Sequence, residues 1–101
     1  MIVNADIITK GIMQDNLLAE YAKKLAQSSI SEIANEIYKN WKPVHPWAKP
    51  YLEAMITLQT VNDNYGSDSG HSVIAYFLGN AAMWKGEAAK AIKKELNKRI
   101  K

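Results

Sequence analysis

The chain has 101 residues, of which 48% are hydrophobic, and a formal net charge of +3. This length and composition predict one folded domain with a single core. The absence of cysteine excludes a disulfide framework and any zinc or iron–sulfur site ligated by cysteine. No uncharged apolar run approaches the roughly 20 residues that span a bilayer, and the N-terminus lacks the pattern of a signal peptide. We therefore expect a soluble cytoplasmic protein that makes no membrane contact.

The positive charge is concentrated at the C-terminus. Residues 85–101 carry seven Lys and Arg against two Glu, which gives +5, whereas the preceding residues carry −2. A preference for anions would therefore be local to this segment.

The N-terminal part predicts an apolar arm followed by two helices. Residues 1–12 are rich in Ile and Val and suit either packing onto their own domain or a dimerisation arm. This arm and the high share of aromatic residues in a small domain lead us to expect a homo-oligomer. Apolar residues at helical spacing predict a helix over residues 14–27. Ser29 with Glu32 forms a capping-box pattern, and it opens the clearest amphipathic stripe of the chain. The expected inward positions of the two helices are Leu17, Leu18, Tyr21, Ala22, Leu25, Ile30, Ile33, Ala34, Ile37, Tyr38 and Trp41.

Residues 42–50 contain three prolines, which fix the backbone and predict a linker between helices. A helix is expected to follow over residues 50–62. The next stretch, residues 65–86, opens with a polar turn that Asp68 or Ser69 could cap, and it continues as an apolar helix over residues 73–84. Gly79 in that helix suggests close approach of a neighbour. A last amphipathic helix is expected over residues 87–100. With no period-two pattern, the fold class is all-α, a compact bundle of four to five helices in a single domain.

The turn at residues 65–72, YGSDSGHS, is the best candidate for a ligand site. Its glycines let backbone N–H groups approach a ligand, and the following helix offers its N-terminal N–H groups to an anion. The alternative is a plain helix cap in a tight turn. As a nucleotide site it would use Tyr65 or Trp84 for stacking and lysines for the phosphates. The candidate ligand-binding residues are Tyr65, Gly66, Ser67, Ser69, Gly70, His71, Trp84 and Lys85.

Other chemistry finds little support in the sequence. The spacing around Asp63 and Asp68 departs from the EF-hand pattern, so no metal site is expected. No arrangement of Ser, His and Asp suits nucleophilic catalysis, so no catalytic residue is proposed and the protein is not expected to be an enzyme. No cofactor is expected either.

The last helix presents a basic face of Lys90, Lys93, Lys94 and Lys98. This face suits phosphate binding, and a nucleic-acid-binding module is the alternative function. Because the helix has mainly Lys and one Arg, reading of base edges is not favoured. The simpler interpretation is a solvated helix face.

The segment YGSDS…VIAYFLGNAAMWKGEAAKAIKKEL resembles a family of small proteins encoded in bacteriophage and prophage genomes. The resemblance covers the C-terminal half, and residues 1–40 show none. It implies a phage protein acting in the bacterial cytoplasm. We accordingly expect a non-enzymatic binding protein that counteracts host defence or sequesters a host factor, either a host protein or an anionic nucleotide.

Overall fold

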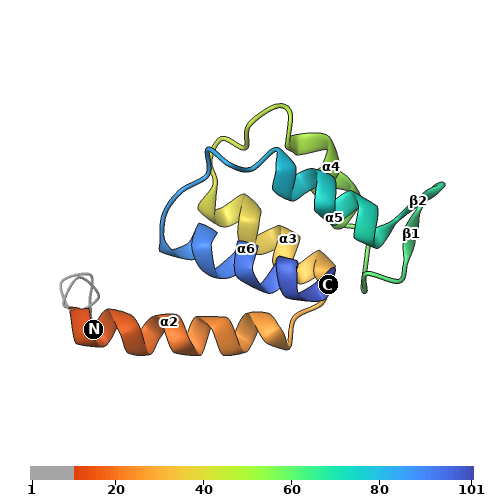
Figure 1. Ribbon diagram of the computed structural model, residues 1–101. Helices are drawn as coiled ribbons and strands as arrows, with labels where there is room; N and C mark the ends of the chain where they lie inside the picture. The colour runs from red at the N-terminus through yellow and green to blue at the C-terminus, as the bar shows by residue number, and fades with distance from the viewer. Residues whose placement is uncertain (1–10) are drawn as a thin grey trace.

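The computed structural model describes residues 11–101, with the side chains of residues 17–101. Most of the proposed apolar arm, residues 1–12, lies outside this part. Five helices and one small hairpin are described: α2 Gly11–Ala26, α3 Ile30–Asn40, α4 Lys49–Met55, β1 Asn64–Tyr65, β2 Asp68–Ser69, α5 Gly70–Gly79 and α6 Glu87–Arg99. The expected all-α fold class is confirmed, and the chain forms one compact helical unit (Figure 1).

The capping box predicted before α3 is present. Ser29 Oγ accepts a hydrogen bond from the Glu32 N–H at 3.0 Å, and Glu32 Oε1 accepts one from the Ser29 N–H at 2.7 Å. These two bonds satisfy N–H groups that a helix start leaves free. The predicted stripe of α3 is also confirmed, since its aliphatic members Ile30, Ile33 and Ile37 are fully buried.

The core gathers side chains from every helix. Phe77 of α5 is the largest fully buried side chain. It lies against Trp41, which in turn stacks on Trp84. The fully buried aliphatic side chains around them are Leu25, Ile30, Ile33, Ile37, Leu52, Met55, Leu58, Ile74, Ile92 and Leu96.

Helix α2 lies along α6, and both run in the same direction (Figure 1). Among the described elements, α6 is the one that α2 contacts extensively. The first turns of α2 reach beyond the start of α6, away from the other helices. The molecule is accordingly elongated, with principal extents of 46 × 26 × 21 Å.

Two helices are shorter than the sequence indicated. Helix α4 ends at Met55, where the Thr57 and Leu58 N–H groups donate to the carbonyls three residues earlier, rather than near residue 62. A second turn follows, in which the Asp63 carboxylate accepts hydrogen bonds from the Gln59 and Thr60 N–H groups. Helix α5 ends at Gly79, where the Asn80 side chain donates to the Tyr76 carbonyl at 2.9 Å. The apolar residues that follow form a non-helical connection to α6.

Three further expectations were wrong. The expected absence of strands fails at β1 and β2, which pair antiparallel. Gly79 accommodates no neighbouring helix, because a Cβ built there meets nothing within 4 Å. The first helix does not bury its whole stripe: Leu25 is buried, but Leu17 is 44% exposed and Ala22 is also exposed.

Candidate functional site

The turn at residues 65–72 is a β-hairpin that leads into a helix. Gly66 has a φ of +60° in the two-residue loop between β1 and β2, which favours glycine there. Ser69 caps α5 as the sequence suggested, since its hydroxyl accepts a hydrogen bond from the Ser72 N–H at 3.1 Å. The hydroxyls of Ser69 and Ser72 also bond to each other, at 3.0 Å. The hydroxyl of Ser69, one of the candidate ligand-binding residues, is therefore already engaged within the cap.

Gly70 holds the base of this hairpin against the preceding loop. Its N–H donates to the Asp63 carbonyl at 2.7 Å, and an added Cβ would lie 2.6 Å from the Val61 carbonyl oxygen. The glycine is therefore explained by close backbone contact within the chain, without a ligand. Tyr65 at 47% exposed and Ser67 remain open to solvent at the tip, and His71 is half-buried in the first turn of α5.

Trp84 and Lys85 do not join this hairpin. They follow the opposite end of α5, a helix of ten residues, which corresponds to a length of about 15 Å. Figure 1 shows the hairpin and the connection between α5 and α6 at opposite ends of α5. The eight residues proposed as one ligand site therefore lie in two separate places.

Trp84 is also closed to a stacking ligand. It is only 4% exposed, and its ring stacks on Trp41 with centroids 5.3 Å apart and planes 8° apart. Its indole N–H donates to the Asn40 carbonyl at 3.4 Å. The proposal that Trp84 stacks on a nucleotide base is therefore wrong, because the ring is part of the core.

The basic face of α6 contains three exposed lysines, Lys90, Lys94 and Lys98, at i, i+4 and i+8. Lys93 does not belong to this row. It is half-buried, donates to the Trp84 carbonyl at 2.7 Å and lies 5.9 Å from the centre of the Trp84 ring. Partial burial, together with the charge of Lys85, lowers the pKa of Lys93.

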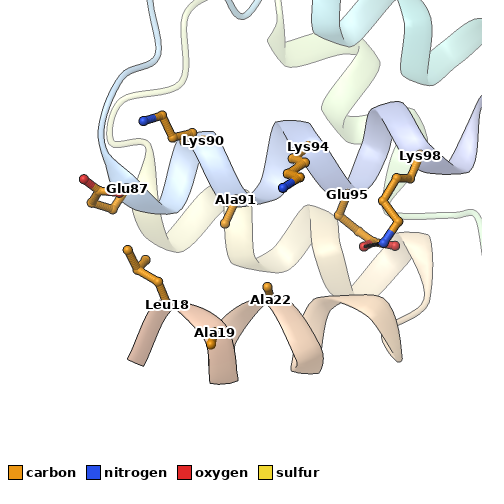
Figure 2. Close-up of a pocket in the computed structure, with 9 residues that line it drawn as sticks. All are labelled: Leu18, Ala19, Ala22, Glu87, Lys90, Ala91, Lys94, Glu95 and Lys98. Atoms are coloured by element: carbon orange, nitrogen blue, oxygen red, sulfur yellow. Dashed lines mark ion pairs between the residues drawn. The ribbon is translucent and has the colours of Figure 1, made fainter. Parts of the chain in front are cut away.

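A groove with a volume of about 450 Å³ lies between α2 and α6 (Figure 2). Its apolar part comes from Leu18 and three alanines, two on α2 and one on α6. Lysines and glutamates of α6 form its rim. The lining residues are Leu18, Ala19, Ala22, Glu87, Lys90, Ala91, Lys94, Glu95 and Lys98.

The rim is basic in its electrostatic effect. Glu95 is 7% exposed and is paired with Arg99 at 2.6 Å and with Lys98 at 3.7 Å, so its charge is compensated. Glu87 lies in the first turn of α6, where the helix dipole favours an acid. Lys90 and Lys94 have no carboxylate within ion-pair distance among residues 17–101.

Two side chains, Arg99 and Tyr21, hold α2 against the bundle through hydrogen bonds. Arg99 donates from Nη2 to the carbonyls of Leu25, Ala26 and Ser28 at 2.9, 3.3 and 3.0 Å. Tyr21 donates to Glu36 of α3 at 2.9 Å. Partial burial and this hydrogen bond raise the pKa of Tyr21. For Glu36, partial burial raises the pKa, but the bonds from Tyr21 and Lys39 and the nearby lysine charges lower it overall.

Sequence reasoning missed this groove because it assigned Ala22 to the core. The sequence could have indicated the groove, because this face of the helix contains alanines where a fully buried face would have larger residues such as Leu and Ile. Only the packing shows that α6 covers one flank of this face and that no other described element covers the rest.

Among the side chains of residues 17–101, no three His, Asp or Glu gather closely enough to hold a metal ion. No helix in the same range is long and apolar enough to cross a bilayer. No protein-family model matches the sequence, and comparisons with curated proteins and with solved structures give no match.

Proposed function

We propose that this chain is a small non-enzymatic binding protein whose partner is a protein, bound in the groove between α2 and α6. The observation that carries the proposal is the groove itself: an apolar floor of Leu18, Ala22 and Ala91 beside an exposed row of lysines. Apolar contact area with a polar rim is the usual composition of a protein interface. The setting that we infer from the resemblance is a phage protein in the bacterial cytoplasm that blocks or sequesters a host factor.

The same observations favour a protein over an anionic nucleotide. Of the two rings proposed for stacking, Trp84 is buried, and Tyr65 is exposed on the hairpin, at the opposite end of α5 from Lys85. The hydroxyls of Ser69 and Ser72 bond within the helix cap. The exposed lysines Lys90, Lys94 and Lys98 belong to α6, whereas the hairpin leads into α5. A small nucleotide would therefore have to bind without the combination of stacking and phosphate contacts that first suggested it.

Affinity capture with matched variants tests the proposal. The purified chain, Ala22→Arg and Ala75→Arg would each be immobilised and exposed to extract from bacteria. Ala22 lines the groove, whereas Ala75 is an exposed alanine of α5 outside it. A partner retained by the wild type and by Ala75→Arg but lost with Ala22→Arg supports the proposal. Retention of the same partners by all three would contradict it.

A nucleic-acid-binding module is the second candidate, favoured by the exposed row of Lys90, Lys94 and Lys98. It predicts binding to single- or double-stranded oligonucleotides that falls steeply with salt, because phosphate contacts release counterions. Mobility shifts at low salt, repeated with Lys94→Glu, would decide it. No shift at about 20 mM salt removes this candidate.

A further inference from the structure

One flank of helix α2 has no covering element among the described residues. Its inner side packs on α6 and buries Leu25, while Leu18 is half-buried and Ala19 and Ala22 are exposed along the groove. Leu17 on another side is 44% exposed. A helix with this much uncovered apolar surface is better explained by a missing partner than by a solvated face.

The shape of the groove suits another helix. Its floor consists largely of alanines, so a second helix axis could approach to about 8 Å, the close end of the range for packed helices. Ala22 and Ala91 face the opening from α2 and α6 (Figure 2). A helix placed there would contact both α2 and α6, and the three helices would form part of a bundle.

The charges of α2 are polarised along its length. Its first ten residues, 11–20, carry Asp15 and Glu20 and no cation, a charge of −2. Its last turns carry Lys23 and Lys24, a charge of +2. Two copies of this helix side by side attract each other when antiparallel, because each acidic half then lies beside a basic half. A parallel pair would bring like charges together.

The lysine row of α6 strengthens this preference. Since α2 and α6 run in the same direction, the end of the groove beside Lys94 and Lys98 is also the end near the basic turns of α2. An antiparallel second α2 would bring Glu20 close to Lys94 and its acidic first half toward Lys98. The occupant that complements this groove is thus contained in the chain itself.

We propose that the groove is occupied by α2 of a second copy, in an isologous, antiparallel dimer with its two-fold axis near Ala22. The inference rests on the proposed function, that the groove binds protein, and it takes the protein bound there to be a second copy of the chain and not the host factor. The α2 and α6 helices of both copies then form a four-helix bundle at the centre of the dimer, and the hairpins lie at its periphery.

Mass and cysteine cross-linking test this arrangement. Light scattering at micromolar concentration should give twice the 11.3 kDa chain mass for the wild type and for Ala75→Glu, and the single mass for Ala22→Glu. Because the chain has no cysteine, a single introduced cysteine can form a disulfide only with the same position of a second copy. Under oxidation, Ala22→Cys should form this intermolecular disulfide rapidly. Ala26→Cys and the control Ala75→Cys should form it at least tenfold more slowly. Equal linking at positions 22 and 26 would indicate a parallel pair and overturn the proposed geometry.

A charge exchange gives an independent reading. Lys94→Glu and Glu20→Lys should each weaken self-association by several-fold, and an equimolar mixture of the two variants should form a mixed dimer. Failure of the mixture to associate more strongly than either variant alone would contradict the pairing. If the wild type is monomeric while captured partners still depend on Ala22, the second-copy inference fails and the protein-binding proposal stands. If the wild type is monomeric and no captured partner depends on Ala22, the second-copy inference and the protein-binding proposal both fail.

Discussion

Arg99 Nη2 lies 2.9 Å from the carbonyl oxygen of Leu25, so the end of the last helix is bonded to the end of the first described one. The carbonyls at a helix C-terminus have no partner within the helix, and a cation there also complements the helix dipole. Arg99 reaches two further carbonyls and holds Glu95 with its Nε. This one side chain therefore joins the C-terminal end of α2 to the C-terminal end of α6.

Arg99→Ala should lower the free energy of unfolding by about 1–3 kcal/mol, the range for hydrogen bonds that involve a charged group. It also leaves the largely buried Glu95 with Lys98 alone. Urea unfolding followed by circular dichroism measures the change. The exposed Lys101→Ala should stay within about 0.5 kcal/mol of the wild type. An equal effect of both substitutions would contradict the role given to Arg99.

Tyr21→Phe should cost about 0.5–1.5 kcal/mol, because it removes the hydrogen bond to Glu36 that joins α2 to α3. The double variant Tyr21→Phe with Glu36→Gln should lose less than the sum of the two single changes. Additive losses in the unfolding free energy would show that the two side chains do not act together.

Two glycines of α5 should respond oppositely to alanine. Gly70→Ala places a Cβ 2.6 Å from the Val61 carbonyl oxygen, and it should destabilise the fold by about 1–3 kcal/mol. Gly79→Ala meets nothing within 4 Å at the end of the helix, and it should stabilise by about 0.4–1 kcal/mol. Thermal or urea unfolding of both variants compares them directly. If Gly70→Ala stabilised the fold, the close contact proposed between Gly70 and the Val61 backbone would be contradicted.

Trp84→Ala should destabilise the fold by about 3–5 kcal/mol, as expected for an aromatic side chain removed from a core. Lys85→Ala, next to it and exposed, should change stability by less than about 0.5 kcal/mol. Near-ultraviolet circular dichroism should also lose the signal of the stacked Trp41–Trp84 pair. A stable Trp84→Ala variant with an unchanged spectrum would contradict burial of this ring.

Asp63 should make stability depend on pH. Hydrogen bonds from the Gln59 and Thr60 N–H groups lower the pKa of its carboxyl below the ordinary value. A depressed folded-state pKa stabilises the fold above the unfolded-state pKa, and this contribution is lost as the pH falls through the folded-state value. The stability difference between the wild type and Asp63→Asn should therefore be constant near neutrality and shrink below about pH 4. If the stability difference between the wild type and Asp63→Asn grew as the pH fell, the lowered pKa given to Asp63 would be contradicted.

The features that the sequence predicted correctly are local. The capping box of Ser29 and Glu32 and the helix cap of Ser69 each depend on residues three apart, and both are present. The stripe of α3 needs only helical periodicity. Such features are visible in sequence because the interacting residues are neighbours.

The features that were missed depend on contacts distant in sequence. Arg99 finds its carbonyls more than 70 residues earlier, and Trp84 reaches Asn40 across 44. Helical spacing places Trp84 on one apolar face with Phe77 and Ala81, and all three are buried, but no periodicity identifies Trp41 as the ring on which Trp84 stacks. The exposure of Ala22 could not be predicted either, because it depends on which helices cover α2. The groove could be recognised only once the position of α6 was known.

Photo-cross-linking from the groove tests most directly whether this surface binds protein. A photoreactive amino acid would replace Ala22 in one chain and Ala75 in another, and both would be irradiated at micromolar concentration and in bacterial cells. The account predicts adducts from position 22, with cross-linked peptides that map to α2 of a second copy, and no adduct from position 75. Absence of any adduct from position 22 in both settings would contradict it.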